Sequence, residues 1–264
     1  KIFGSELKEI MRLLRSSGKE CYIVGGAIRD LLLGYEKFTD IDLTTSLSVE
    51  QMKQIFNQNK IRFDDRAIRY GCLTISNQKR SFQITSFRKD IRNFGRAADI
   101  ELVENIEEDA KRRDFTINAF YCSYNGQIID PLGNLEDLNK IKLDFIGDPE
   151  IRIKEDYLRI LRFFRFIAVL DLKDENLVSK NLPIIRKHID GISDLSYERV
   201  ASEIRKILLA RSPSFALKLM NKVDLYKRLF GIYSQASLHK IEKLENRFNL
   251  KPSLVRRLLA LEIK

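Results

Sequence analysis

The feature that most constrains the fold of this chain is a change of pattern near residue 140. Before it, β-branched and aromatic runs alternate with helix-like stretches; the strand candidates are CYIV, IDLTT, GCLTIS, SFQITSF and GQIID. After it, the sequence reads as helices punctuated by DP, LP, SP and KP steps, with almost no strand-like alternation. We therefore expect an α+β fold in which a mixed-sheet domain is followed by an all-α region.

Length and composition indicate a soluble globular protein. The chain has 264 residues, with 44% hydrophobic and 32% charged, which argues against disorder and allows one large or about two ordinary domains. No apolar run approaches the roughly 18 residues of a membrane-spanning helix, so we expect no membrane partner. The chain begins with Lys1 rather than Met and its last segment is still helix-like, so we expect residues to be missing at both ends. No signal or transit peptide is visible.

Charge and cysteine content narrow the partner and the compartment. Lys and Arg total 47 against 37 acidic residues, and the net charge of +10 suits a polyanion such as nucleic acid or nucleotide phosphates. Cys21, Cys72 and Cys122 are far apart and form no CxxC pair, which argues against a disulfide framework or a zinc cluster. We therefore expect a cytoplasmic location.

Two acidic residues alternate along one predicted strand. In a strand of period two, Asp40 and Asp42 share one face, while Ile41 and Leu43 point into the core. Two carboxylates one pleat apart can hold Mg²⁺, which prefers oxygen ligands. The alternative is a strand end with solvated acids, which is the more common meaning of an isolated DxD.

A glycine pair follows the first predicted strand. Gly25 and Gly26 lie where a strand turns into a helix, and glycines there let backbone N–H groups approach a phosphate. Arg29, three residues beyond, can add a bidentate contact to a phosphate oxygen. An ordinary tight turn is the alternative, and the pattern is not a Walker P-loop.

A charged stripe is predicted in the helical half. The segment EDYLRILRFFR repeats charged residues every three positions, so that on one helix they form a slowly drifting stripe beside an apolar one. The alternative is a solvated helix face. The members of the stripe are Asp156, Arg159, Arg162 and Arg165.

Five motifs in a fixed order carry a resemblance to a known family. They are VGGAIRDLLLG, DIDLTT, KRRDFTINA, DPLGNLEDL and EDYLRILRFFR, within a stretch from about Lys19 to about Arg205. Together they resemble the class II tRNA nucleotidyltransferases, the CCA-adding enzymes and bacterial poly(A) polymerases of the polymerase-beta-like superfamily. The resemblance implies a nucleotidyltransferase catalytic head over 1–140, a helical neck over 141–190 with the nucleotide-selecting helix, and a helical body over 191–264, truncated at its C-terminus.

The resemblance implies roles for the acids and the glycine turn. Asp40 and Asp42 would be the catalytic carboxylates that hold two Mg²⁺ ions. The triphosphate of the nucleotide would contact Gly25, Gly26 and Arg29.

Sugar and base would be selected by two later motifs. Within RRDFTINA, Arg113 and Asp114 would contact the ribose, because a guanidinium and a carboxylate can both pair with a 2′-OH. Asp156 would accept from the amino group of cytosine or adenine, and Arg159 would donate to the ring nitrogen. Uracil and guanine carry a carbonyl instead and would be rejected.

Other segments of the chain also resemble family motifs. Two further arginines, Arg162 and Arg165, would extend the stripe toward the nucleotide and its phosphates. We expect a mobile loop over 88–98, opened by Arg88, Lys89 and Asp90 and with Gly95 and Arg96 on its far side. The motif YERVASEIRKIL would brace helices through Glu198, Arg199 and Glu203.

One position departs from the family pattern. Members often carry a third acidic residue on the strand before the loop, and the matching residue here is Gln83. An amide offers a carbonyl oxygen but no negative charge. Three alternatives stay open: the third ligand is dispensable, Asp64 or Asp65 replaces it, or activity is weakened.

The resemblance implies addition of CMP and AMP from CTP and ATP to the 3′ end of tRNA, with release of pyrophosphate. Its partners would be the tRNA 3′ end and the two nucleotides. One alternative is the same chemistry with another product, as in a poly(A) polymerase or an enzyme that adds only CC or only A. An alternative of another class is a catalytically inactive RNA-binding module.

Overall fold

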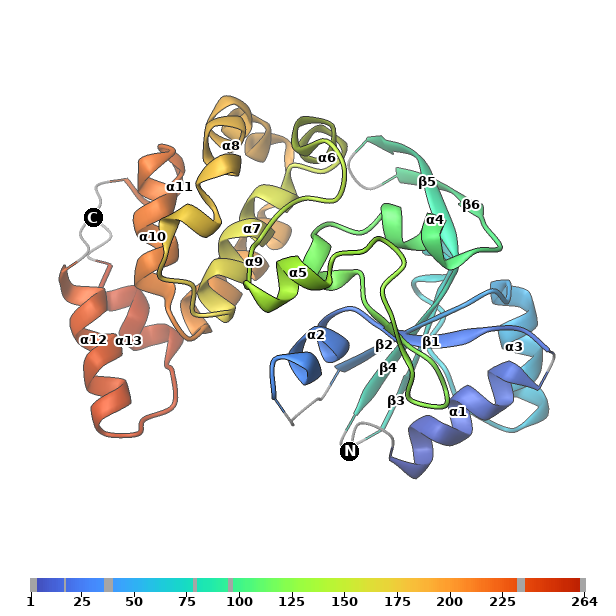
Figure 1. Cartoon of the computed structure of the whole chain (residues 1–264). Helices are drawn as coiled ribbons and strands as arrows, with labels where there is room; N and C mark the ends of the chain where they lie inside the picture. Colours follow the sequence, from blue (N-terminus) through green and yellow to red (C-terminus); the bar gives the residue numbers. More distant parts are fainter. Residues whose placement is uncertain are drawn as a thin grey trace. The chain divides into compact units, whose positions relative to one another are not determined.

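The computed structural model describes residues 4–16, 18–35, 40–77, 80–94, 97–231 and 236–261. The chain divides into two compact units, Lys1–Lys140 and Ile141–Lys264. Figure 1 shows sheets and helices in the first unit and helices in the second. Each unit has its own buried apolar core.

A six-stranded mixed sheet forms the centre of the first unit, in the order β3-β4-β2-β1-β7-β8 (Figure 1). The central strands β2 and β4 are parallel, and the other neighbours are antiparallel. Every strand candidate of the sequence contributes to this sheet, which confirms the predicted mixed sheet. The strands are β1 Cys21–Val24, β2 Asp40–Thr45, β3 Cys72–Ser76, β4 Ser81–Ser86, β7 Tyr121–Cys122 and β8 Ile128–Ile129.

Short helices surround the sheet of the first unit. In α1, apolar residues at helical spacing, Leu7, Met11 and Leu14, are fully buried. Ser48 starts α3 with a capping box, in which its side chain and that of Gln51 bond each other's backbone N–H. The helices are α1 Ser5–Arg15, α2 Gly26–Leu32, α3 Val49–Gln58, α4 Ile106–Lys111 and α5 Leu135–Asn139, with 3₁₀ turns η1 Ile68–Tyr70 and η2 Thr116–Asn118.

The segment expected to be a loop over 88–98 is a two-stranded ribbon, so that prediction is wrong for the described backbone. β5 (Arg88–Phe94) pairs antiparallel with β6 (Ala97–Leu102), with a register shift between Asp90 and Arg92. The two strands satisfy each other's backbone N–H and C=O groups, which an irregular loop would leave to water. Figure 1 shows the ribbon near α4. The predicted far side of the loop, Gly95 and Arg96, lies outside the described residues.

The second unit is helical, and its described residues contain no strand, as predicted. Proline stands in the first turn of α6, α8 and α10, which explains the DP, LP and SP steps of the sequence. The helices are α6 Pro149–Glu155, α7 Leu158–Val169, α8 Leu182–His188, α9 Tyr197–Leu209, α10 Pro213–Lys222, α11 Leu225–Phe230, α12 Ala236–Arg247 and α13 Leu254–Leu259, with 3₁₀ turns η3 Glu175–Leu177, η4 Ser179–Asn181 and η5 Ile189–Asp194.

The core of the second unit is built around α7, which packs against α9 and α10. Its phenylalanines Phe163, Phe164 and Phe166 are buried and belong to this core. Phe163 stacks on Phe145 with ring centroids 5.8 Å apart. Across the described residues of both units, no helix has the length and apolar character needed to cross a membrane.

Candidate functional site

The two acids of β2 share one face of the sheet. Asp40 and Asp42 are exposed, whereas Ile41 and Leu43 between and after them are each only 1% exposed. This is the alternation of a strand with one buried face. The geometry required for two carboxylates to act together on one face is therefore present.

A row of directly paired residues crosses the sheet at Asp42. Asp42 is paired with Val24 on β1 and with Gln83 on β4, and Gln83 is paired with Thr74 on β3. Directly paired residues project from the same face of a sheet. The exposed Gln83 side chain therefore lies beside Asp42, at the position where the family pattern calls for an acid.

The alternative acids lie farther from Asp42. Asp64 forms an isolated bridge with Thr74, so it stands three strand positions from Asp42, about 14 Å at the usual strand spacing. The Asp64 carboxylate is bound by Arg66, and Asp65 is bound by Lys53 at 2.9 Å. Gln83, rather than either acid, is the side chain placed next to Asp42.

The glycine turn meets this acid face. Gly25 has φ 76° and ψ −135°, a backbone conformation that L side chains rarely adopt, so glycine is needed there. A Cβ built on Gly25 would lie 3.6 Å from Asp42 Oδ2 and 3.8 Å from Arg113 Nη1. Three predicted site residues from three separate motifs, Gly25, Asp42 and Arg113, therefore meet at one corner of the first unit.

A second chain of contacts links the predicted phosphate and ribose residues. Arg29 is 5% exposed; its Nη1 donates to Asn118 Oδ1 at 2.7 Å, and its Nε and Nη2 donate to Asp30 Oδ1. Asn118 Nδ2 then donates to Asp114 Oδ1 at 3.0 Å. A Cβ on Gly26 would lie 3.5 Å from Arg29 Nη2, so this guanidinium also lies beside the glycine turn. Asn118 was not singled out from the sequence, although it belongs to the quoted KRRDFTINA motif.

A buried acid holds Arg113. Asp109 of α4 is 0% exposed, and its Oδ2 accepts from Arg113 Nη2 and from the Tyr121 hydroxyl, each at 2.9 Å. Burial raises the pKa of the Asp109 carboxyl, but Arg113, Arg112 and their hydrogen bonds outweigh burial and hold that pKa at about 2. The carboxylate is therefore ionised. Its i,i+4 spacing to Arg113 was the only signal in the sequence.

Asp156 is not part of the helix that carries the arginines, contrary to the prediction. α6 ends at Glu155 and α7 begins at Leu158, and Asp156 between them has extended backbone angles, φ −155° and ψ 105°. Its Oδ1 accepts from Leu158 N–H at 3.1 Å, and its Oδ2 accepts from Arg199 Nη2 at 2.8 Å. A carboxylate that bonds the backbone two residues ahead competes with helix continuation, which explains the break.

The arginines of α7 have partners within the second unit. Arg159 is 8% exposed, and its Nη1 donates to the backbone oxygen of Arg152 at 2.6 Å and to the Glu155 carboxylate. Arg165 Nη1 lies 3.0 Å from a carboxylate oxygen of Glu203. The stripe on α7 comprises Arg159, Arg162 and Arg165.

Helix α9 supplies two of the partners of this region. Arg199 binds Asp156 ahead of α7, and Glu203 pairs with Arg165 farther along α7 and with Lys206 at 3.0 Å. These contacts are the helix bracing predicted for Arg199 and Glu203. The buried Glu203, 3% exposed, balances cations on both helices.

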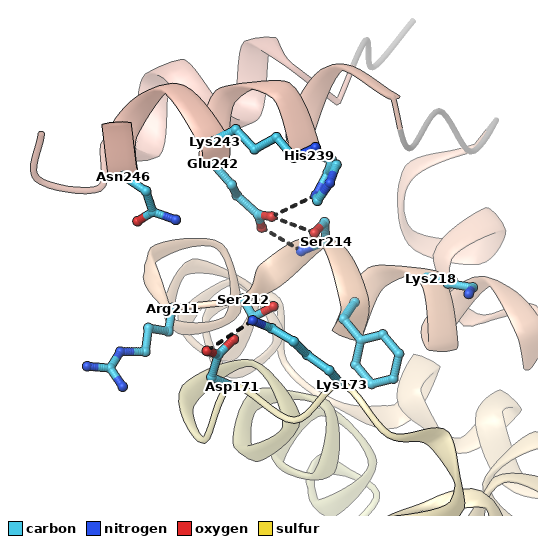
Figure 2. A pocket seen from close by; sticks show the side chains of 11 residues that line it. Asp171, Lys173, Arg211, Ser212, Ser214, Lys218, His239, Glu242, Lys243 and Asn246 are labelled. Carbon is cyan, nitrogen blue, oxygen red and sulfur yellow. Dashed lines mark hydrogen bonds and ion pairs between the residues drawn. The ribbon is translucent and has the colours of Figure 1, made fainter. Parts of the chain in front are cut away.

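A cavity of about 790 Å³ lies elsewhere in the second unit, and none of the predicted site residues lines it (Figure 2). Glu242 on its wall accepts hydrogen bonds from the Ser214 N–H at 2.7 Å and the Ser214 hydroxyl at 2.5 Å, and His239 Nδ1 lies 3.6 Å away. Asp171 pairs with Lys173 at 3.4 Å. The basic lining residues are Lys173, Arg211, Lys218 and Lys243.

The donor set at Asp42 fits one kind of metal. Among the described residues, no group of three or more His, Cys, Asp or Glu side chains is arranged to hold a metal ion. Zinc and similar ions need such a cluster. Mg²⁺ keeps several waters and is commonly held by one or two carboxylates together with substrate phosphates. Asp40 and Asp42, with the amide oxygen of Gln83 beside them, fit Mg²⁺.

Comparisons with known proteins agree with this architecture. The sequence model described as the poly A polymerase head domain matches residues 21–144. A second model, described as the probable RNA and SrmB-binding site of polymerase A, matches residues 183–236. The two matches occur in order and correspond to the mixed-sheet unit and to part of the helical unit.

Relatives of known name cover nearly the whole chain. The chain is 34% identical over 255 residues to the human mitochondrial CCA tRNA nucleotidyltransferase 1, covering 95% of the chain and 58% of that protein. It is 36% identical over 243 residues to the CCA-adding enzyme of Streptococcus pyogenes, covering 90% of the chain and 58% of that protein. The chain thus spans a little over half the length of these relatives.

A solved structure confirms the fold. The crystal structure of the Bacillus stearothermophilus CCA-adding enzyme in complex with CTP superimposes with a TM-score of 0.74 at 28% identity, over 98% of this chain and 66% of that one. The predicted α+β nucleotidyltransferase head followed by helices is therefore correct. The chain therefore contains, in order, a region that matches the poly A polymerase head domain and one that matches the RNA-binding region of polymerase A, and it is similar over nearly its whole length to CCA tRNA nucleotidyltransferases.

Proposed function

We propose that the protein adds CMP and AMP from CTP and ATP to the 3′ end of tRNA, without a nucleic-acid template. The observation that carries this proposal is the corner where Gly25, Asp42 and Arg113 meet. An acid face, a glycine turn and a partly buried guanidinium are the parts that a nucleotidyl transfer needs at one place, because charge must be neutralised at the triphosphate and at the attacking hydroxyl.

Asp40 and Asp42 are proposed to be the catalytic carboxylates and the ligands of two Mg²⁺ ions. When bound, these ions supply activation of the tRNA 3′-OH and charge neutralisation at the leaving pyrophosphate. The exposed pair on one face of β2 supports the assignment. Gln83 would contribute an uncharged oxygen, so the third ligand is proposed to be an amide rather than Asp64 or Asp65.

The turn and its neighbours are proposed to hold the triphosphate and the ribose. Gly25 and Gly26 would let the backbone approach the phosphates, and Arg29 lies beside Gly26 to bind them. Arg113 and Asp114 would contact the ribose through its 2′-OH. The hydrogen bonds from Arg29 to Asn118 and from Asn118 to Asp114 support these assignments, because they connect the proposed phosphate-binding residues to the proposed ribose-binding residues.

Base selection is proposed for the start of α7. Asp156 already accepts two hydrogen bonds, but a carboxylate has about four acceptor positions and can still accept from an exocyclic amino group. Arg159 uses Nη1 for protein contacts, and a guanidinium has five N–H donors to share with a ring nitrogen. Arg162 is proposed to contact the nucleotide. Arg165, paired with Glu203, would act by bracing the helix rather than by direct contact.

The helical unit is proposed to bind the tRNA backbone. The match to a described RNA-binding region over residues 183–236 supports this. Four basic residues against two acidic ones line the cavity of Figure 2, and both acids have close partners there. Such a lining favours phosphate oxygens. Within the chain, we propose a head over 1–140, a neck over 141–190 and a body over 191–264.

The proposed compartment is the cytoplasm. Cys21, Cys72 and Cys122 are buried and unpaired, which suits a reducing compartment. A relative named mitochondrial is 34% identical to the chain, so cell fractionation of the full-length protein is the check on this point.

A direct test is to incubate the protein with tRNA that ends at the discriminator base, together with each nucleotide mixture, and to sequence the 3′ ends. The proposal predicts CCA ends with CTP and ATP together, and CC with CTP alone. Long A tracts would instead identify a poly(A) polymerase, a product that the name of the matched head model favours as the alternative. Unchanged ends in every mixture would mean an inactive RNA-binding module.

A further inference from the structure

The head contains a buried negative charge to which the proposed mechanism gives no role. Asp109 accepts from Arg113 and the Tyr121 hydroxyl at Oδ2, and from Arg112 Nε at Oδ1, 2.8 Å away. Thr44 Oγ1 lies 3.5 Å from Oδ2. A fully buried carboxylate is costly unless it is paired, so such an arrangement indicates a specific task for the charge.

Asp109 fixes the direction in which the Arg113 guanidinium faces. Nη2 of Arg113 donates to Asp109 at 2.9 Å, and Nε donates to the Tyr121 hydroxyl at 2.9 Å. Two of the three guanidinium nitrogens are thus held on the buried side. The third, Nη1, is the one that lies 3.8 Å from the Cβ position of Gly25.

This orientation places the positively charged guanidinium of Arg113 beside Asp42, a proposed metal ligand. The Cβ position of Gly25 is also 3.6 Å from Asp42 Oδ2, so Nη1 and that oxygen border the same small volume. An arginine and a carboxylate at such a place can form a strong bidentate pair. A divalent cation and the guanidinium would then compete for one carboxylate.

We propose that Asp109 is a positioning residue that anchors Arg113 and balances its charge, so that the guanidinium does not take Asp42 away from a divalent cation. The inference rests on the proposed cation site at Asp40 and Asp42. It assigns to Asp109 an effect on cation affinity that is transmitted entirely through Arg113.

A purely structural role makes a different prediction. Asp109 also ties α4 to the sheet through Thr44 and Tyr121, and a loss of that packing would weaken the whole corner. In that case, the removal of Arg113 would not restore the cation affinity that is lost when Asp109 is replaced. The two roles therefore differ in a double variant.

The test uses Mn²⁺ as the probe, titrated by electron paramagnetic resonance into the protein without nucleotide. Asp109→Asn should weaken Mn²⁺ binding about fivefold or more, because the positive charge of Arg113 beside Asp42 is then no longer balanced by Asp109. Arg113→Met in the same chain should restore the affinity to that of Arg113→Met alone. Thr44→Val, which removes a neutral contact to Asp109, is the matched control and should bind like the wild type.

Several results would overturn the inference. One is an Asp109→Asn protein that is folded by its thermal unfolding and binds Mn²⁺ like the wild type. Another is a double variant as weak as Asp109→Asn. If Asp109→Asn does not fold, Arg113→Met and the double variant are compared, and unequal affinities contradict the proposal. Asp42→Asn distinguishes a failure of the proposed cation site from a failure of the role given to Asp109. If Asp42→Asn binds Mn²⁺ as tightly as the wild type, the cation site itself is wrong, and the role of Asp109 is wrong with it.

Discussion

Asp42 on β2 is directly paired with Gln83 on the parallel strand β4. The residue beside the proposed metal ligand is therefore neutral, and the site has one negative charge fewer than an acid there would provide. Since carboxylates bind Mg²⁺ more strongly than amides do, the pairing bears on how much Mg²⁺ the enzyme needs.

Gln83→Glu should lower the Mg²⁺ concentration for half-maximal nucleotide addition by about tenfold, the effect of roughly 1.4 kcal/mol from one added charge. Mg²⁺ titration of CMP incorporation is the measurement. Thr74→Glu, one strand farther along the same row, is the control and should change the Mg²⁺ requirement much less. An unaltered Mg²⁺ requirement in Gln83→Glu would show that this position takes no part in cation binding.

Asp156→Ala should lose discrimination against UTP and GTP. A wrong base leaves buried polar groups unpaired at roughly 1–3 kcal/mol each, so selectivity for CTP over UTP should fall by about 10- to 100-fold. Single-nucleotide incorporation with each of the four triphosphates measures it. Arg199→Ala removes the 2.8 Å partner of Asp156 and should give a smaller loss. Equal selectivity in Asp156→Ala and the wild type would refute the template role.

Replacement of both Lys218 and Lys243 by alanine should weaken tRNA binding and make it less dependent on salt. Each phosphate contact contributes about 0.7–0.9 to the slope of log affinity against log salt, so the slope should fall by about 1.5. Fluorescence anisotropy at several salt concentrations gives both quantities. Lys240 on α12 is exposed but does not line the cavity, so Lys240→Ala is the matched control. Identical slopes in the double variant and this control would exclude the cavity as a phosphate site.

The parts of the structure that depend on local pattern were predictable from the sequence. The alternation of DIDLTT places Asp40 and Asp42 on one face because a strand has a period of two. Proline steps marked the helix starts for a similar reason, since proline fits the first turn of a helix. The order of the motifs indicated the head and the helices that follow.

The parts that depend on partners distant in the sequence were not predictable in the same way. Asp156 leaves the helix because it bonds Leu158 and is held by Arg199, 43 positions away, while the spacing of three continues unbroken across the helix end. The charged residues along Arg88–Phe94 interrupt the alternation of apolar and polar residues that would have identified β5 as a strand. The burial of Asp109 depends on Tyr121 of β7 and Thr44 of β2, which no local pattern reveals.

Asp42 is proposed to act in the transfer of the nucleotide and not in the binding of RNA. The most direct test is the rate of CMP addition to tRNA by Asp42→Asn, measured beside tRNA affinity. Asp64→Asn, an acid of the same row placed three strands away, is the control. We expect a loss of about 10³-fold in rate for Asp42→Asn with tRNA affinity unchanged, and a near wild-type rate for Asp64→Asn. An Asp42→Asn protein that adds CMP within about tenfold of the wild-type rate would contradict this role of Asp42.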